Sequence, residues 1–220
     1  MCFGDSLALP REGCPYDETW ISKLKKMYPN TDFICNFLGG MLIGDLSNFW
    51  WYMKHVGADV VVIQEGVCDS SPRYVNDRRL LWKVVLALCG KIRITSLFWW
   101  LIKKGNRNPS CTYTPISVFE KKYHELLNDM YCSGVKYIVI IKIGHGSPNV
   151  VCRNKYFNSN ADLYNNIFEK FKEKYKEKLI LIDPLNIIED DMTVDGYHCN
   201  AKGMEMVFSE LVKVLNTING

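Results

Sequence analysis

The sequence predicts an α/β protein with a three-layer α/β/α arrangement, in which about five parallel strands form one sheet between two layers of helices. Short apolar segments alternate along the whole chain with segments of helical periodicity. The segment 59–63, Asp-Val-Val-Val-Ile, is almost uniformly apolar, which is typical of a strand covered on both faces. We therefore expect the flavodoxin-like strand order 2-1-3-4-5, with a functional site at the carboxyl ends of the strands.

The length of 220 residues suits one domain with a sizeable core and is too short for two ordinary domains. We expect a single domain over 1–220 with a basic, apolar helical insertion at about 78–107. The apolar fraction of 48% and the charged fraction of 23% are typical of soluble globular proteins. Strands are expected before Gly4 and at 31–36, 59–63, 135–143 and 179–182, and helices at 19–28, 45–55, 115–133, 160–178 and 201–215.

The chain begins with a motif that suits a nucleophile, Phe3-Gly-Asp-Ser-Leu7. Gly4 permits a sharp turn directly after a short apolar strand, and Ser6 follows within that turn. A serine hydroxyl placed there stands clear of the sheet edge, and the backbone N–H groups behind it can face a developing oxyanion. The alternative is that Asp5 or Ser6 simply caps a helix.

Near the other end of the chain lies a second motif, Asp195-Gly-Tyr-His-Cys-Asn-Ala-Lys-Gly203. Asp195 and His198 are three residues apart in a turn that ends at Asn200, a suitable N-cap for the last helix. This spacing lets the carboxylate reach the imidazole, fix its tautomer and support its charged form during proton transfer. One chain therefore carries a serine, a histidine and an acid that orients the histidine.

These two stretches, FGDSL and DGYHCNAKG, resemble the first and last motif blocks of the SGNH (GDSL-type) hydrolase family. The resemblance implies the SGNH hydrolase fold and a serine hydrolase acting on carboxylic ester bonds, with no metal and no organic cofactor. It implies Ser6 as the nucleophile, His198 as the base and Asp195 as its partner. It also implies an oxyanion hole formed by the N–H groups of Ser6 and of a glycine in the second block, for which Gly40 matches best and Gly39 second best.

The third block departs from that family. Its pattern is Gly-x-Asn-Asp, in which the Asn side chain is an oxyanion donor, whereas residues 66–69 here read Gly-Val-Cys-Asp. Cys68 stands at the Asn position, and a thiol is a poor hydrogen-bond donor. Arg73 or Asn76 could take over the role of the missing amide. Residues expected to line the pocket are Asp5, Gly39, Cys68, Asp69, Arg73 and His145, although a loop histidine without a role is the alternative for His145.

The segment from Gly66 to Arg73, GVCDSSPR, resembles a subset of SGNH proteins encoded among bacterial surface-polysaccharide genes. This resemblance implies a small-molecule or glycan ester as the substrate, with removal of an O-acetyl group from a carbohydrate as the reaction. An O-acyltransferase with the same triad is one alternative. A non-catalytic or membrane-recruited binding protein is the other.

Between residues 78 and 119 the chain has no acid but eight basic residues, so the rest of the chain is net acidic although the whole carries +3. The apolar residues of 79–104 predict helices that cover the active-site edge as a cap, form a homodimer surface or lie at a membrane surface. The segment is too interrupted by charge to span a bilayer. We expect no nucleic-acid binding, because the basic residues are interleaved with core-like aliphatics.

Nine cysteines, an odd number without CxxC spacing, argue against a disulfide framework or a zinc site and predict reduced, mostly buried thiols. Asp5 interrupts the first apolar run, so we expect no signal peptide. Together these features predict a cytoplasmic protein, with a peripheral membrane contact through 79–104 as an open alternative.

Overall fold

The central element of the computed structural model is a five-stranded parallel sheet. The structure describes residues 1–105 and 107–219. The strands are β1 (Cys2–Gly4), β2 (Cys35–Phe37), β3 (Val60–Gln64), β4 (Tyr137–Ile141) and β5 (Leu179–Ile182), in the order β2-β1-β3-β4-β5. The predicted fold class and strand order are thus confirmed. The second strand is shorter than expected, because pairing with β1 begins only at Cys35.

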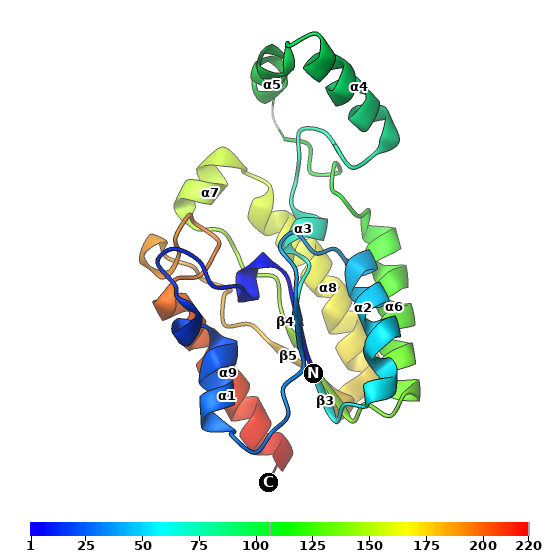
Figure 1. Cartoon of the computed structure of the whole chain (residues 1–220), viewed down its shortest axis with the longest axis vertical. Coiled ribbons are helices and arrows are strands. Elements are labelled where there is room, and N and C mark those ends of the chain that lie inside the picture. The colour runs from blue at the N-terminus through cyan, green and yellow to red at the C-terminus, as the bar shows by residue number, and fades with distance from the viewer. Residues whose placement is uncertain (106, 220) are drawn as a thin grey trace.

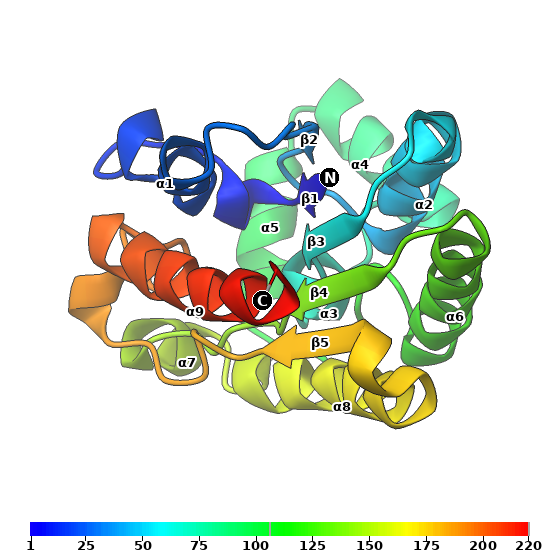
Figure 2. The same cartoon turned by 90° about the horizontal axis from the view of Figure 1, so that it is seen from below.

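Helices cover both faces of this sheet, as Figure 2 shows in a view along the layers. One face carries α1 and α9, and the other carries α2, α6 and α8. The helices of the described residues are α1 (Trp20–Met27), α2 (Ile43–Met53), α3 (Val67–Ser70), α4 (Leu80–Lys91), α5 (Thr95–Lys103), α6 (Ile116–Cys132), α7 (Pro148–Arg153), α8 (Phe157–Tyr175) and α9 (Ala201–Asn219). The short helices α3 and α7 were not predicted, since four and six residues are too few to show helical periodicity.

The sheet separates the core into two clusters. Because successive strand residues point to opposite faces, Val61 and Ile63 of β3 pack with α2, α6 and α8, while Val62 between them packs with α1 and α9. All three side chains are buried. This double burial explains why the strand sequences are apolar at consecutive positions instead of alternating.

The turn after β1 depends on the absence of a side chain at Gly4. A Cβ atom there would lie 2.7 Å from the Ala8 Cβ and 3.0 Å from the Phe37 ring. Every other residue type would push the following turn away from β2. Gly4 therefore sets the position of Ser6, two residues later in the chain.

Helices α4 and α5 form a hairpin that projects from the body of the protein (Figure 1). They pack on each other, with the rings of Trp82 and Phe98 at 6.2 Å between centroids. The predicted cap is therefore not observed, since the hairpin stands away from the body instead of packing over it. Within the described residues, no helix is long and apolar enough to cross a bilayer.

The nine cysteines all have free thiols, and burial varies among them. Four are buried, three are partly buried, and Cys132 and Cys152 are exposed. The expectation of mostly buried thiols was therefore too strong.

Gly66 precedes α3 with a positive φ of 122°, and a Cβ there would meet the Ile143 side chain at 2.8 Å. We expect Gly66→Ala to lower the free energy of unfolding by about 1–3 kcal/mol, through backbone strain and overpacking. Urea titration followed by circular dichroism measures the change. Gly39→Ala is the matched control, because a Cβ at Gly39 meets nothing within 4 Å, and its effect should stay within about 0.5 kcal/mol. Equal losses in the two variants would contradict this account.

Candidate active site

Ser6 lies in a short 3-10 turn, Ser6–Ala8, directly after β1. Asp5 caps this turn, because its Oδ1 accepts a hydrogen bond from the Leu7 N–H at 2.8 Å. The Asp5 N–H in turn donates to the Gln64 carbonyl of β3 at 2.9 Å. Asp5 therefore fixes the position of Ser6 in two ways, through its bond to the following turn and through its bond to the last residue of β3.

His198 connects Ser6 to Asp195. The His198 Nε2 lies 2.9 Å from the Ser6 Oγ, and the His198 Nδ1 lies 2.7 Å from the Asp195 Oδ2. The other carboxylate oxygen accepts from the His198 N–H at 3.0 Å and from the Tyr197 N–H at 3.3 Å. With Nδ1–H donating to the carboxylate, Nε2 is left as the acceptor for the serine hydroxyl. The arrangement can therefore take a proton from Ser6.

The environment keeps the histidine neutral at neutral pH. Burial of the imidazole, together with the positive charge of Arg11, lowers the pKa of His198 despite the opposing effect of Asp195. Burial on its own would raise the pKa of Asp195, but hydrogen bonds from His198 outweigh it and hold that pKa below its ordinary value. An ionised acid beside a neutral imidazole is the starting state that a general base needs.

Two backbone N–H groups near the serine are free to bind an oxyanion. In residues 1–105 and 107–219, neither the Ser6 N–H nor the Gly40 N–H donates to a protein acceptor. The β1–β2 register pairs Gly4 with Phe37, so Ser6 and Gly40 follow the same edge of the sheet. Gly40 has φ 74°, a conformation that favours glycine, and Gly39 forms the turn with it. The Gly39-Gly40 loop therefore offers the second side of a candidate oxyanion hole.

Cys68 lies in the first turn of α3, after β3, and is partly buried. Burial, with the nearby charge of Asp5, raises the pKa of its thiol to about 12. The thiol therefore stays neutral and remains a poor donor. Of the two suggested substitutes, Asn76 is buried and donates its amide to the carbonyls of Thr112 and Tyr113, at 2.8 and 3.3 Å. Because these two carbonyls already accept the hydrogens of the Asn76 amide, Asn76 does not replace the missing oxyanion donor.

Three arginines surround the same loops. Arg11 donates to the Ser6 carbonyl, Arg78 to the Gly40 carbonyl at 3.0 Å and Arg73 to the Cys68 carbonyl at 3.5 Å. The guanidinium carbon of Arg73 also lies 3.4 Å from the centroid of the Tyr113 ring. Each guanidinium thus fixes one of the three loops and adds positive potential near Ser6. Sequence reasoning named Arg73 but missed the other two, which belong to no motif.

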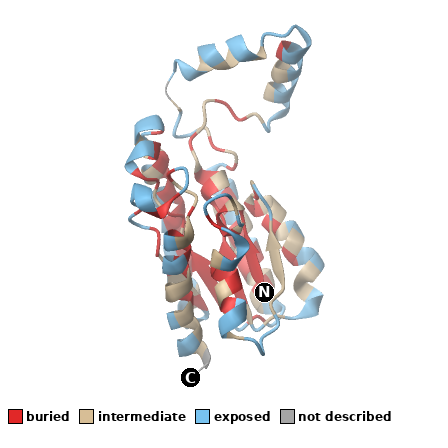
Figure 3. Ribbon diagram, turned by 60° about the vertical axis from the view of Figure 1, so that its left-hand side comes forward, coloured by how far each residue is buried: buried red, intermediate tan, exposed pale blue. Residues whose placement is uncertain are grey.

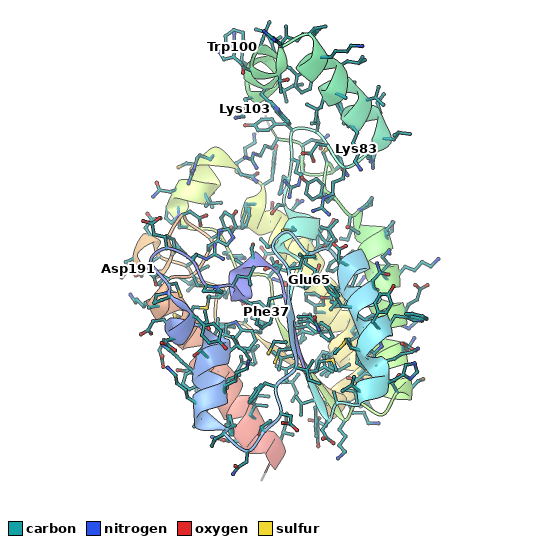
Figure 4. The ribbon with its side chains drawn as sticks, in the orientation of Figure 1. Phe37, Glu65, Lys83, Trp100, Lys103 and Asp191 are labelled. Atoms are coloured by element: carbon teal, nitrogen blue, oxygen red, sulfur yellow. The ribbon has the colours of Figure 1, made fainter. Side chains whose placement is uncertain are left out.

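A pair of buried acids lies behind these loops. Asp69 accepts a hydrogen bond from the Ile43 N–H at 3.2 Å, which ties α3 to the start of α2. Glu65 accepts from the Tyr123 hydroxyl at 2.7 Å and lies inside the body in Figure 4. Burial, then the adjacent Asp69, raises the pKa of Glu65 well above its ordinary value, so Glu65 keeps its proton. The sequence signal for Glu65 was an acid placed at the end of an apolar strand.

Asp5 completes the set of buried carboxyl groups. It is fully buried, and burial raises its pKa to about 7 although the Leu7 N–H favours the charged form. His145 lies elsewhere, since its Nε2 pairs with the Asp162 Oδ1 on α8 at 2.8 Å. The structure therefore brings Asp5, Gly39, Cys68, Asp69 and Arg73 to the loops around Ser6, and places His145 in a separate contact with Asp162.

The solved structures that are similar to this chain include several esterases. The chain aligns over 100% of its length with 97% of the esterase EstA from Pseudoalteromonas sp., whose structure was determined inhibited by monoethylphosphonate (TM-score 0.62, 14% identity). It aligns over 97% with 92% of an acetylxylan esterase from Geobacillus stearothermophilus (TM-score 0.57, 12% identity). A carbohydrate acetylesterase family member from Sinorhizobium meliloti aligns over 98% and 96% of the two chains (TM-score 0.59, 13% identity).

The chain has the SGNH hydrolase fold. Two further comparisons give no match, since neither a family model nor a curated protein is similar enough to the sequence. At 10–14% identity the similarity to solved structures establishes the fold alone. The chemistry of this SGNH-fold protein therefore depends on the residues of its own site.

The pKa of His198 predicts how the reactivity of Ser6 depends on pH. A protonated imidazole cannot take the serine proton, so labelling of Ser6 by a fluorophosphonate should rise with pH through the His198 pKa. Because that pKa lies below the ordinary value of 6.5, we expect half-maximal labelling below pH 6.5. Mass spectrometry of the labelled peptide measures the rate.

Asp195→Asn should slow this labelling by about 10³–10⁴-fold, because the imidazole loses the partner that fixes its tautomer. Asp191→Asn is the control, since Asp191 lies on the same loop but pairs with Lys202 at 2.7 Å (labelled in Figure 4). A midpoint above pH 6.5, or an equal effect of the two substitutions, would count against the arrangement.

Proposed function

We propose that this protein is a serine esterase that removes a small acyl group, an O-acetyl group, from a carbohydrate or a similar small ester. The observation that carries the proposal is the continuous hydrogen-bonded chain from the Ser6 Oγ through His198 to the Asp195 carboxylate, at 2.9 and 2.7 Å. The acetylxylan esterase and the carbohydrate acetylesterase with the same fold support the choice of substrate class.

The reaction would proceed through an acyl-enzyme. The Ser6 Oγ attacks the carbonyl carbon of the ester while the His198 Nε2 takes the hydroxyl proton. The resulting oxyanion faces the N–H groups of Ser6 and Gly40, and the tetrahedral intermediate collapses as His198 returns the proton to the leaving alcohol. Water then attacks the acyl carbon while His198 takes the proton of this water, and His198 returns that proton to the Ser6 Oγ as the bond to the acyl carbon breaks and the carboxylic acid leaves. Asp195 stays ionised throughout.

Hydrolysis of p-nitrophenyl acetate by the wild type and by Ser6→Ala tests this proposal. We expect release of free acetate by the wild type, a rate at least about 10³-fold lower in Ser6→Ala, and a preference for acetate over butyrate and octanoate. Ser159→Ala is the matched control, because this serine on α8 is exposed and its hydroxyl donates to the Tyr156 carbonyl.

Equal activity in the wild type and in Ser6→Ala would overturn the proposal. Acyl transfer that requires an added sugar acceptor, without release of free acetate, would identify an O-acyltransferase that uses the same triad. Measuring free acetate and acylated sugar in the same reaction distinguishes hydrolysis from acyl transfer.

Cys68 offers a second test, because a neutral thiol contributes little to an oxyanion hole. We expect Cys68→Asn to raise kcat for p-nitrophenyl acetate by about 10–100-fold, somewhat less than the 10²–10³-fold loss measured when such a donor is removed elsewhere. Cys68→Ala should change kcat by less than about threefold, since the thiol is a poor donor. Steady-state kinetics at pH 8 measures both.

A large loss of kcat in Cys68→Ala would show that the thiol itself takes part in the reaction. An unchanged kcat in Cys68→Asn, with an unchanged melting temperature, would show that another group already completes the oxyanion hole. Arg73 is then the next candidate, because it lies beside the same loop.

A further inference from the structure

The hairpin of α4 and α5, residues 79–104, has one side that packs on itself and one that faces outward. Trp82, Cys89 and Phe98 are wholly or partly buried between the two helices. The outward side carries exposed apolar residues, most of them more than half exposed: Leu80, Leu81, Val84, Leu88, Ile92, Ile94, Leu97, Trp100 and Leu101. Figure 3 shows the contrast between this mostly exposed hairpin and the buried sheet. A patch of this kind on one projecting element indicates an interaction surface.

Basic residues stand among these apolar side chains. Arg79, Lys83, Lys91, Arg93, Lys103 and Lys104 are exposed, and none pairs with a carboxylate in the part of the chain that the structure describes. Figure 4 shows Lys83 on α4, and Trp100 and Lys103 on α5. The Lys104 Nζ lies 3.4 Å from the centroid of the Trp100 ring, so charge and apolar surface adjoin directly. A partner must therefore bind the basic residues and cover the apolar surface at the same time.

We propose that this hairpin docks on the surface of a bilayer that contains anionic phospholipid. The leucines, isoleucines and Trp100 would enter the boundary between headgroups and acyl chains, and the lysines and arginines would bind lipid phosphates. The hairpin would lie on the membrane without crossing it, since the longest uncharged run within the hairpin, 94–102, is far too short to span the hydrocarbon core. This surface is independent of the proposed esterase reaction.

A second copy of the chain fits this surface less well. In a symmetric dimer the same patch would face itself, so six cations would meet six cations with no acid between 78 and 119 to compensate. Nucleic acid also fits less well, because it would leave the aliphatic side chains without a partner. An anionic lipid surface satisfies both the charges and the apolar area.

The position of the hairpin determines which end of the protein would face the membrane after docking. Its stems are bonded to each other, with the Arg73 N–H donating to the Cys111 carbonyl at 2.8 Å and the Asn108 N–H to the Arg73 carbonyl at 3.2 Å. They leave the body at the end where the strands finish, the same end that carries Ser6 (Figure 1). A docked protein would therefore hold this end of the sheet nearest the membrane.

Co-sedimentation with vesicles tests the proposal. Vesicles of phosphatidylcholine with 30% phosphatidylglycerol should bind the protein at least about tenfold more tightly than vesicles of phosphatidylcholine alone, because each basic residue near an anionic surface adds attraction. Salt at 0.5 M should weaken the difference by screening. The same preparation is assayed for its oligomeric state by light scattering.

Two sets of substitutions separate the contributions. The charge set should lower the affinity for anionic vesicles on the order of a hundredfold, which corresponds to three lysines at about fivefold each. Its members are Lys83→Gln, Lys91→Gln and Lys103→Gln, and the control with equal net charge is Lys25→Gln, Lys155→Gln and Lys178→Gln. The apolar set, Leu88→Ser, Trp100→Ser and Leu101→Ser, should lower the affinity by at least about tenfold, and its control is Trp51→Ser with Tyr52→Ser, two exposed aromatics on α2.

Equal loss in a hairpin set and in its control would overturn the proposal, as would wild-type protein that ignores anionic vesicles. A dimer that dissociates in the apolar set and binds no vesicles would show that a second copy is the true partner. Circular dichroism establishes that each variant is folded. Hydrolysis of a soluble ester should be unchanged in the hairpin variants, so that failure of docking and failure of the esterase reaction are recognised separately.

Discussion

The position of β1 between β2 and β3 determines which loops meet at Ser6. Its register pairs Gly4 with Phe37 on one side and with Gln64 on the other. The pairing continues past the strand, since the Leu38 N–H donates to the Gly4 carbonyl at 3.0 Å and the Asp5 N–H donates to the Gln64 carbonyl at 2.9 Å. The loops after three neighbouring strands therefore start at one level. These three loops can therefore be short and still reach the serine, whereas His198 reaches it from the long connection between β5 and α9.

Charge around the serine is arranged in two layers. Behind the loops lie Asp5, Glu65 and Asp69, and burial raises the pKa of each of these carboxyl groups. Beside the loops lie Arg11, Arg73 and Arg78, which bond to backbone carbonyls instead of carboxylates. Burial keeps Glu65 protonated and so reduces the negative charge beneath the site, while the three arginines add positive potential beside Ser6. Negative charge that develops on a bound ester is favoured by this field.

The parts of the site that depend on spacing could be predicted from the sequence. Asp195 and His198 share one turn, and a carboxylate three residues before an imidazole can reach both its backbone N–H and its Nδ1, as the structure shows. The parallel sheet was likewise predictable, because apolar strand segments that alternate with helices favour a parallel sheet covered on both faces. These are local patterns, and local patterns are visible in one sequence.

The parts that depend on contacts between distant residues could not be predicted. Arg78 reaches the Gly40 carbonyl, and Asp69 reaches the Ile43 N–H, across 38 and 26 residues of the chain, and no sequence pattern indicates either contact. His145 follows a strand just as Ser6 does, yet it pairs with Asp162 on α8, because a strand end fixes only the level of a residue.

The hairpin shows the same limit in its clearest form. Apolar residues at helical spacing predict that α4 and α5 bury a face, but they do not say against what. Half of that expectation is met internally, by Trp82 against Phe98, while Leu80, Leu81 and Trp100 stay exposed. Helices α2, α6 and α8 already cover one face of the sheet, so the exposed apolar residues of the hairpin have no site on the body to pack against. The hairpin also contains no acidic residue that could neutralise its lysines. The exposed apolar surface and the basic residues therefore both favour an external partner that is apolar and negatively charged.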